Sequence, residues 1–528
     1  MKHRLSKWLL CLIDVGIFAG AFLIAAWLKP ATVRVYIPSY WKPVSLFLMI
    51  WVGVSLSSNK YKTFKERRYS SILSSIISTA FLSTAIIAII MVTFKQMNYS
   101  RLIVLGTLFF ATILEILISW SYYFTRKFIL KDPDFAMSGL MTHSKRPENG
   151  ELDNESKYHL QNDERYIPQF NHQDGFQPLL DKLKNEYIVD KNILFEFINS
   201  SLDLNNFDQK KSDILNTATL YNIKKYEDTS LEFLLNLHQL NDFRRINEYF
   251  IEANRVLKNG GVFVSCGQTL EERSREIKNK YIKPLAYLII FFDFIFNRVF
   301  PKIDLLKGIY FSITKGKNRP VSYCEILGRL YFCGFRVIAI RESDNRLFFI
   351  AVKEKEPSNH PNPSYGPLYK KRAIGKNEKY IYVYKFRTMH PYSEYVHDYM
   401  VKNFGYNEIG KPANDFRVTR WGKWMRRLWL DELPQLLNVL KGEMKLVGIR
   451  PITMTFLNEF PEDVRKLRAK YKPGCIPAYV SLLKQSKDGF IEAETIYLRE
   501  KESHPIWTDI KYFSQAIFNI VTGKIRSN

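Results

Sequence analysis

Long apolar stretches crowd the first quarter of the chain. Four of them hold few charged residues and cover residues 7–28, 41–57, 71–94 and 101–124. A helix needs about 20 apolar residues to cross a bilayer, and four closely spaced stretches do not fit a cleaved signal peptide. The pattern therefore predicts a four-helix transmembrane domain over residues 1–130.

Lysine and arginine are distributed unevenly around these stretches. They gather at the amino-terminal end and in the loop between the second and third stretches: Lys2, Arg4, Lys7, Lys60, Lys62, Lys65, Arg67 and Arg68. Because cytoplasmic loops carry an excess of basic residues, we expect both termini and everything after Lys127 to be cytoplasmic. Five scattered cysteines without a C-x-x-C pair agree with a reducing compartment and argue against a structural zinc site.

Two carboxylates interrupt the apolar stretches, Asp14 in the first and Glu115 in the fourth. Ionisable groups at membrane depth can mark a proton or ligand path between helices. The alternative is a carboxyl near the membrane interface, or one that is hydrogen-bonded within the bundle. We favour this alternative, because two isolated acids do not make a relay.

The next residues, 131–180, are polar and without periodicity, which predicts a linker or a long loop. Regular patterns return over residues 181–355. In order, they predict a helix, a strand, a second helix and a β-hairpin, at 248–257, 262–266, 323–334, and 335–340 with 346–352. Residues 258–261 between the first helix and the strand are expected to form a helix stop.

This order of elements resembles the second half of a class I methyltransferase fold. That family binds S-adenosylmethionine on a glycine-rich turn, but residues 131–240 here hold only three isolated glycines, Gly139, Gly150 and Gly175. A backbone that approaches a cofactor closely needs clustered glycines. We therefore expect a degenerate Rossmann-like α/β domain that acts as a scaffold or regulator, with an active methyltransferase as the less favoured alternative.

One segment of this region, residues 282–311, is again apolar. Its core of twelve residues, 285–296, includes Asp293 and is too short to span a bilayer. Two alternatives remain: an interfacial or re-entrant membrane helix broken at Pro301, or a helix buried in the protein core.

The charge balance narrows the choice of partners. The chain carries 77 Lys and Arg against 52 Asp and Glu, a net charge of +25, which suits nucleic acid, anionic lipids or phosphate-bearing substrates. The predicted membrane helices favour the last two. Because no recognised nucleic-acid-binding motif is present, we expect membrane lipids and no nucleic acid as partners.

Candidate chemistry lies in the carboxyl-terminal third, residues 356–528. Proline is tolerated in the first turn of a helix and aspartate is a favoured N-cap, so the sequence Asp431-Glu432-Leu433-Pro434 predicts a helix that begins at Asp431. Taken alone, the acidic pair fits a simple helix cap. Arginines on both sides of it in the sequence argue for more than a cap: Arg417, Arg420, Arg426, Arg427 and Arg450.

Two carboxylates among guanidinium groups suit phosphoryl transfer. Nearby cations hold a carboxylate in its ionised form, an ionised carboxylate can attack phosphorus as a nucleophile, and a neighbouring carboxylate can hold Mg²⁺. Arginine binds phosphate oxygens in a bidentate manner. The group is therefore suited to transfer from a diphosphate, where catalysis rests on positioning and charge neutralisation.

These residues resemble the catalytic domain of the bacterial sugar transferases, the polyprenyl-phosphate glycosylphosphotransferases, over roughly residues 366–521. The matching motifs are, in chain order, GP at 366–367, YKFRTM at 384–389, D-x-R-x-T at 415–419 with Gly422 and Arg426, LDELPQL at 430–436, NVLKGEM at 438–444, VGIRP at 447–451 and KPG at 472–474. Four membrane spans followed by a nucleotide-fold-like middle are also similar to the large members of that family.

The resemblance implies a small mixed α/β catalytic domain and a phosphoglycosyl transferase of the bacterial inner (cytoplasmic) membrane. Such an enzyme moves a sugar-1-phosphate from a UDP-sugar to undecaprenyl phosphate, releases UMP, requires Mg²⁺, and initiates exopolysaccharide, capsule or O-antigen synthesis. Asp431 is then the nucleophile and Glu432 its metal-linked partner. The other expected contacts to substrate or phosphate are Arg426, Lys385, Arg387, Arg450, Arg417 and Glu494, although a structural charge beside Pro451 is an equal alternative for Arg450.

Two segments depart from the family pattern. Residues 366–375 lack the usual glutamine, and residues 475–489 replace the usual I-T-G-W and N-G-R sequences, with Glu494 where the family has aspartate. These segments help bind the nucleotide-sugar in the family, so the donor sugar stays open. The family also places its re-entrant helix shortly before GP, whereas residues 282–311 lie well upstream.

A hypothesis of a different class is a catalytically inactive membrane scaffold or regulator of a polysaccharide assembly complex. The intact Asp431-Glu432 pair and its arginines argue against it. The sequence leaves open whether the chain forms a homodimer and whether it works with downstream glycosyltransferases.

Overall fold

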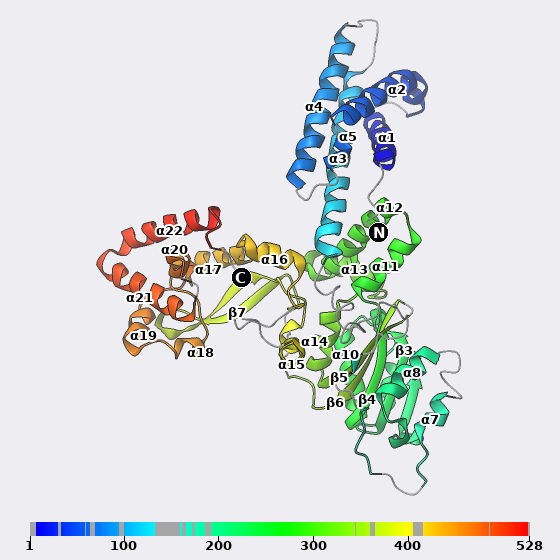
Figure 1. The fold of residues 1–528 in the computed structure, drawn as a ribbon, viewed down its shortest axis with the longest axis vertical. Coiled ribbons are helices and arrows are strands. Elements are labelled where there is room, and N and C mark those ends of the chain that lie inside the picture. The colour runs from blue at the N-terminus through cyan, green and yellow to red at the C-terminus, as the bar shows by residue number, and fades with distance from the viewer. Residues whose placement is uncertain are drawn as a thin grey trace, which may run out of the picture. The chain divides into compact units, whose positions relative to one another are not determined.

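The computed structural model, shown in Figure 1, divides the chain into two compact units. One unit contains Met1–Ile129 and Tyr281–Phe292, and the other contains Leu130–Lys280 and Asp293–Asn528. The structure describes residues 7–29, 33–58, 60–63, 69–93, 100–131, 159–160, 165–171, 175–184, 192–343, 345–359, 365–404, 415–484 and 486–525. Most of the predicted linker at 131–180 lies outside these residues.

The first unit contains the four predicted apolar helices. They are α1 (Lys7–Trp27), α2 (Val33–Ser57), α4 (Tyr69–Thr93) and α5 (Arg101–Phe124), with a short α3 (Lys60–Thr63) between α2 and α4 and a π-helical turn at Thr125–Ile129. Phe18, Trp51 and Leu108 pack at the centre of the bundle. Large apolar side chains such as Phe81 and Phe109 are exposed, as expected for a surface that faces lipid.

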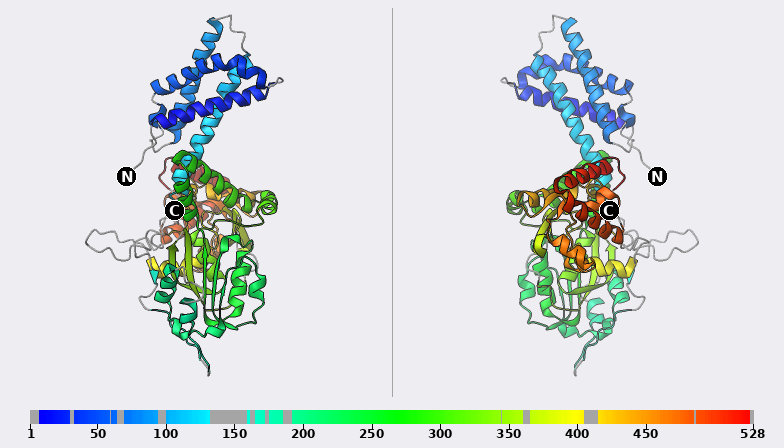
Figure 2. Two further views of the ribbon diagram at one scale, coloured as in Figure 1. Left: turned by 90° about the vertical axis from the view of Figure 1, so that its right-hand side faces the viewer. Right: turned by 90° about the vertical axis from the view of Figure 1, so that its left-hand side faces the viewer.

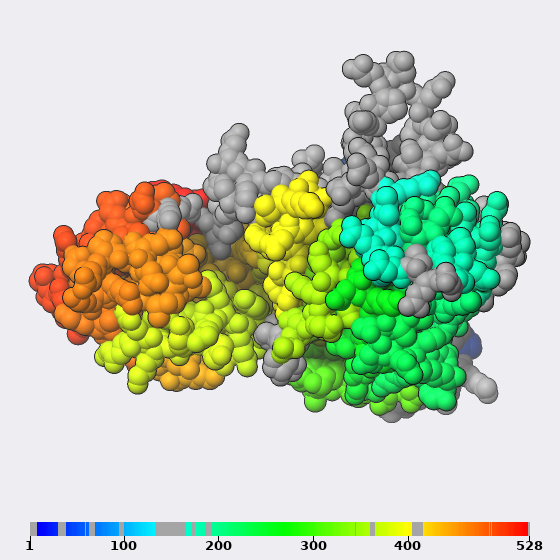
Figure 3. All heavy atoms as spheres, turned by 90° about the horizontal axis from the view of Figure 1, so that it is seen from below, coloured from blue at the N-terminus to red at the C-terminus, as the bar shows by residue number. Residues whose placement is uncertain are grey.

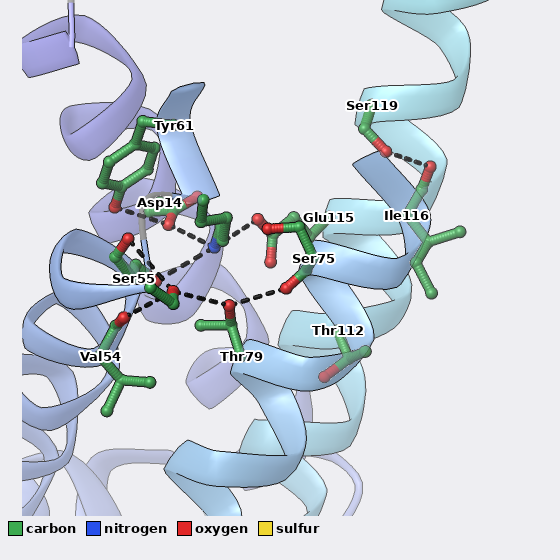
Figure 4. Close-up of polar contacts among 12 residues, drawn as sticks. Asp14, Val54, Ser55, Tyr61, Ser75, Thr79, Thr112, Glu115, Ile116 and Ser119 are labelled. Carbon is green, nitrogen blue, oxygen red and sulfur yellow. Dashed lines mark hydrogen bonds and ion pairs between the residues drawn. The ribbon is translucent and has the colours of Figure 1, made fainter. Parts of the chain in front are cut away.

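Buried charges join three of these helices (Figure 4). The Lys60 ammonium donates a hydrogen bond to Asp14 Oδ2 at 2.7 Å, lies 2.5 Å from Glu115 Oε1, and donates to Ser55 at 3.2 Å. The Tyr61 hydroxyl also donates to Asp14, at 2.8 Å. Asp14 and Glu115 are therefore paired inside the bundle, as favoured from the sequence. The sequence places Lys60 in the basic loop between the second and third apolar stretches; in the structure it begins α3 and its side chain is completely buried.

A fifth apolar helix begins at α12 (Lys283–Phe294) and continues through a π-helical turn at Ile295–Val299 and a 3-10 turn at Phe300–Lys302. The whole segment Lys283–Lys302 is long and apolar enough to cross a membrane. The prediction that it is too short is wrong, because the turns extend the helix beyond its apolar core. Tyr287 and Phe291 pack on the Tyr122 and Trp120 rings of α5, at 5.0 and 5.4 Å. With five such helices, the chain is a membrane protein.

A six-stranded sheet forms the core of the middle region. Its strands are β1 (His159–Leu160), β2 (Ser212–Leu215), β3 (Leu231–Gln239), β4 (Leu257–Gly267), β5 (Phe335–Ser343) and β6 (Arg346–Lys353). The spatial order is β1-β5-β6-β4-β3-β2. Strands β2, β3 and β4 run parallel, whereas β6 pairs antiparallel with both β4 and β5. The Rossmann-like nature of this region stays a prediction.

Helices cover both faces of this sheet (Figure 2). α10 (Ile246–Val256) and α14 (Tyr323–Phe332) pack on one face, and α7 (Leu179–Lys182) and α8 (Asn192–Ser201) on the other. The remaining helices of the region are α9 (Tyr221–Lys224), α11 (Leu270–Lys280) and α13 (Asp304–Thr314). The predicted helices and hairpin are confirmed, and α10 ends at Val256, just before residues 258–261, which the structure assigns to the first part of β4.

The carboxyl-terminal region is a mixture of short strands and helices. Its strands are the antiparallel hairpin β7 (Leu368–Ile374) and β8 (Tyr380–Phe386), and the parallel pair β9 (Lys445–Gly448) and β10 (Gly474–Pro477). Its helices are α15 (His397–Phe404), α16 (Arg420–Arg427), α17 (Leu436–Leu440), α18 (Met454–Leu457), α19 (Glu462–Ala469), α20 (Ala478–Leu482), α21 (Lys487–Ser503) and α22 (Pro505–Val521). The expected mixed α/β character is confirmed.

The segment before and within α15 packs on the middle region (Figure 3, yellow against green). Tyr392, Val396 and Met400 share the core of α10 and α14. Gly328 of α14 allows the closest approach, because a Cβ atom there would lie only 2.3 Å from the Tyr392 carbonyl oxygen. The two regions are thus joined by a continuous apolar core.

Candidate functional site

The Asp431-Glu432 pair lies in a tight turn and not at the start of an α-helix. Trp429 adopts left-handed backbone angles, with φ of 58°, and a 3-10 helix (η10, Leu430–Gln435) follows before α17 begins. The prediction that Asp431 caps the helix is therefore wrong, since Trp429 holds that position. The tight turn leaves the side chain of Asp431 free for other contacts.

Asp431 is buried, with 5% of its surface exposed. Its Oδ1 atom has no hydrogen-bond partner among the described residues. Burial raises the pKa of Asp431, the negative charge of Glu432 raises it further, and Lys385 and Arg426 lower it. The cations around this carboxylate therefore offset only part of the effect of burial, contrary to the expectation that they dominate.

Glu432 is held by two side chains. Its Oε1 accepts a hydrogen bond from Lys385 Nζ at 2.6 Å, and its Oε2 accepts one from Gln435 Nε2 at 2.9 Å. Lys385 reaches it because η10 packs against β8. Asn438 fixes this packing, since its side chain accepts from the Tyr384 amide and donates to the Tyr382 carbonyl.

Arg426 reaches the site from the last turn of α16. Thr419 caps this helix by accepting a hydrogen bond from the Gly422 amide at 2.9 Å, and its hydroxyl donates to the Thr388 carbonyl. Arg426 Nε donates to the Thr388 hydroxyl at 2.9 Å. Burial lowers the pKa of Arg426 and the charge of Asp431 opposes this effect, which shows that the guanidinium lies near the carboxylate. The D-x-R-x-T motif thus positions Arg426.

Arg450 lies with its guanidinium over the rings of Tyr479 and Phe490, at 5.2 and 4.7 Å. The pKa of Tyr479 is raised to about 12, mainly by burial; Arg450 opposes this rise, and the charges of Glu432 and Asp431 add to it. Arg450 and Tyr479 therefore belong to the same site as Asp431.

Three of the predicted contact residues are engaged elsewhere. Glu494 is almost completely buried, forms an ion pair with Arg468, and accepts a hydrogen bond from the Arg450 amide at 2.7 Å. Arg417 makes a bidentate pair with Asp415, at 2.8 Å for both bonds. Glu494 and Arg417 are thus placed to support the backbone that presents other site residues.

Arg387 also lies apart from the acidic pair in its described contacts. Its Nε donates to the Gly366 carbonyl at 2.9 Å, and its guanidinium lies 5.7 Å from the Tyr369 ring. This contact links the GP motif at 366–367 to the YKFRTM motif at 384–389.

Three residues of the site were not predicted. Gln435 holds Glu432, and Tyr479 lies beside Arg450. Lys371 is close to Lys385, since burial lowers its pKa and the charge of Lys385 lowers it further. The alternation of β7 could have identified Lys371, because it lies two residues from Tyr369, the register partner of Lys385. Tyr479 has no local sequence signal.

The site offers oxygen ligands that fit Mg²⁺. Asp431 Oδ1 and Gln435 Oε1 are both buried and without a hydrogen-bond partner among the described residues. Hard cations take such oxygen ligands, and Mg²⁺ usually combines one or two carboxylates with substrate phosphates. Within the described part of the chain no group of three or more acidic, histidine or cysteine residues forms a metal cluster.

Comparisons with known proteins match this part of the chain. Residues 359–523 match the family model described as bacterial sugar transferase. Galactosyl transferase CpsE of Streptococcus agalactiae serotype III (strain NEM316) is 33% identical over 160 residues, which cover 30% of this chain and 35% of that protein. The UDP-N-acetylgalactosamine-undecaprenyl-phosphate N-acetylgalactosaminephosphotransferase of Aeromonas hydrophila is 32% identical over 173 residues, 30% of this chain and 37% of that protein.

A longer match extends beyond the carboxyl-terminal third. The UDP-glucose:undecaprenyl-phosphate glucose-1-phosphate transferase of Escherichia coli (strain K12) is 25% identical over 304 residues, 54% of this chain and 59% of that protein. These matches span between about a third and three fifths of the lengths of the relatives.

Proposed function

We propose that this chain, whose residues 359–523 match the bacterial sugar transferase family model, is a membrane phosphoglycosyl transferase. It would move a sugar-1-phosphate from a UDP-sugar to undecaprenyl phosphate and release UMP. The observation that carries the proposal is the free, buried Oδ1 of Asp431 beside the Lys385–Glu432 ion pair and Arg426. The names of the relatives support the donor and acceptor classes.

Asp431 acts as the nucleophile in this proposal. Its carboxylate oxygen attacks the phosphorus that bears the sugar, the bond from that phosphorus to the bridging oxygen breaks, and UMP leaves. An oxygen of undecaprenyl phosphate then attacks the same phosphorus. The acyl-phosphate bond breaks, the Asp431 carboxylate is restored, and the product is a lipid diphosphate sugar that starts polysaccharide synthesis.

The surrounding residues have separate roles. Lys385 fixes Glu432 and lowers the pKa of Asp431, while Arg426 and Arg450 would bind phosphate oxygens. Asp431, Glu432 and Gln435 would hold Mg²⁺ together with the substrate phosphates. The ion, when bound, neutralises charge on the diphosphate.

The rest of the chain would place this chemistry at the cytoplasmic face of the bacterial inner membrane. Parallel strands β2–β4 followed by an antiparallel pair, covered by helices on both faces, support a shortened Rossmann-like domain without methyl transfer. The five apolar helices support anchoring beside the lipid acceptor.

The test is UMP release by full-length protein in nanodiscs, with undecaprenyl phosphate, Mg²⁺ and a panel of UDP-sugars, beside Asp431→Asn. The proposal expects release with one donor and loss of at least about 1,000-fold in the variant, since a nucleophile cannot be replaced by an amide. Release that is equal in both proteins would reject Asp431 as the nucleophile.

A further inference from the structure

Five cationic side chains gather around a single buried carboxylate, Glu325, away from the acidic pair. They come from three parts of the chain: Arg298 and Lys302 at the end of the fifth apolar helix, Arg319 and Arg329 before and within α14, and Arg387 directly after β8. Glu325 is completely buried, and each of the four guanidinium residues is less than 8% exposed. Such a surplus of buried positive charge is costly without an anion.

Among the described contacts, Glu325 accepts hydrogen bonds from two of these cations, Arg298 and Arg329. Its Oε2 accepts a hydrogen bond from Arg298 at 2.8 Å, and its Oε1 accepts two from Arg329, at 2.7 and 3.0 Å. Although burial raises the pKa of Glu325, the cations around it lower that pKa to well below its usual range. Glu394, which is exposed, lies near Arg387 of this group. Both oxygens of Glu325 are therefore occupied.

Two polar groups of the cluster are left without partners. Arg319 Nε and the Tyr365 hydroxyl are buried and make no hydrogen bond among the described residues. Lys302 Nζ forms no ion pair or hydrogen bond with any residue that the structure describes, and it lies 5.4 Å from the Tyr365 ring. Arg329 approaches the same ring, also at 5.4 Å. Donors from separate elements thus converge at Tyr365.

The cluster is joined through Arg387 to the end of β8, the strand that carries Lys385, and it is open to solvent at one side. Gly366, next to Tyr365, accepts the hydrogen bond from Arg387. Arg298 donates to the Pro320 carbonyl, which holds it beside Arg319. Lys302 and Tyr365 are partly exposed, so solvent reaches the cluster here.

We propose that the cluster of Arg298, Lys302, Arg319, Arg329 and Arg387 is a binding site for a phosphate group, separate from the acidic pair. A phosphate offers several oxygens, each of which can accept from a guanidinium, an ammonium or a phenol. A phosphate complements the charge and the planar donor geometry of the guanidinium groups, which a neutral ligand does not. Its source is either a lipid phosphate headgroup, which the position after an apolar helix allows, or a free nucleotide.

The test is equilibrium binding to full-length protein in nanodiscs made of zwitterionic lipid, with radiolabelled undecaprenyl phosphate in one arm and radiolabelled UDP in the other. Variants Arg319→Gln and Lys302→Gln each remove one donor, and Lys307→Gln is the matched control, an exposed lysine on α13 that pairs with Asp304. We expect each cluster variant to weaken one ligand at least about 10-fold, with the control within twofold of the parent protein.

Loss confined to undecaprenyl phosphate identifies the lipid headgroup, and loss confined to UDP identifies the nucleotide. Binding of both ligands within twofold of the parent protein would overturn the proposal and leave the cluster a structural feature. Because Arg319→Gln can impair folding, the parent protein provides a second measurement. Acetylation of Lys302, followed by mass spectrometry, is expected to slow at least about fivefold in the presence of either undecaprenyl phosphate or UDP, and a rate unchanged by both would also overturn the proposal.

The proposal rests on the proposed function only for the choice of probes. Binding is measured directly and does not require sugar transfer, so a protein that transfers no sugar can still bind phosphate here. Conversely, an active enzyme whose cluster variants bind normally would reject this site alone.

Discussion

Replacing Lys385 with methionine tests the electrostatics of the site most closely. The Lys385 ammonium lies 2.6 Å from Glu432 Oε1, and the two side chains are 28% and 18% exposed. A hydrogen bond between charged groups contributes about 1.5–3 kcal/mol, and partial exposure places this pair in the lower half of that range. A loss of about 1.5–2 kcal/mol corresponds to a 10- to 30-fold fall in kcat/KM.

The same change has a signed effect on pH dependence. Burial and the charge of Glu432 raise the pKa of Asp431, and Lys385 lowers it. Removal of Lys385 therefore raises the pKa of Asp431 further. Because Asp431 must be ionised to act as the proposed nucleophile, the acid side of the pH–rate profile is expected to move to higher pH in Lys385→Met. Lys385→Arg keeps the charge and is expected to keep the acid side near its original position.

The assay is UMP release across pH 5.5–9 with the donor that supports turnover. Lys376→Met is the control, an exposed lysine in the turn at the far end of the β7–β8 hairpin. A Lys385→Met profile that falls only in height, without any shift of its acid side, would refute the proposed coupling between Lys385 and Asp431.

Two further changes test the packing of each unit. Gly474→Ala places a Cβ atom 2.1 Å from the Gly448 amide nitrogen. This overlap should cost about 1–3 kcal/mol of folding free energy and lower the melting temperature. The control Gly308→Ala, on an open helix surface, should raise the melting temperature slightly. Lys60→Met leaves Asp14 and Glu115 without their cation and should cost about 3–5 kcal/mol of folding free energy, seen as loss of monodisperse protein on size-exclusion chromatography. A triple variant that also neutralises both acids should restore the monodisperse protein. Failure of the triple variant to do so would contradict the charge argument.

Local patterns predicted most of the regular elements. Apolar stretches of about 20 residues identify the four amino-terminal helices, because a bilayer demands both length and hydrophobicity. Turn chemistry places the β5–β6 hairpin at Asn345, whose φ is 57°. The apolar core of the fifth helix predicts a segment too short to span a bilayer, because it stops before the turns that continue the helical backbone to Lys302.

The site was predicted in part, for a physical reason. Asp431, Glu432, Lys385 and Arg426 lie in recognisable motifs, and the structure brings them together. Side chains from distant segments, such as that of Tyr479, reach the site only through the tertiary fold, so no local pattern reports them.

A local sequence pattern also cannot predict which charged side chains are buried. Lys60 looks like a loop cation in the sequence, yet its ammonium neutralises two acids from other helices. The partners of a charge, which decide whether it can be buried, lie 46 and 55 residues away along the chain.

The central claim is that Asp431 carries the phospho-sugar during transfer. The most direct measurement incubates the protein with a UDP-sugar labelled in the sugar and Mg²⁺, without lipid acceptor, and locates the label by mass spectrometry after rapid acid quenching. The account predicts label on the peptide that contains Asp431, one UMP released for each labelled chain, and discharge of the label when undecaprenyl phosphate is added. Lipid product formed by an Asp431→Asn protein at the parent rate, with no labelled peptide in either protein, would contradict it.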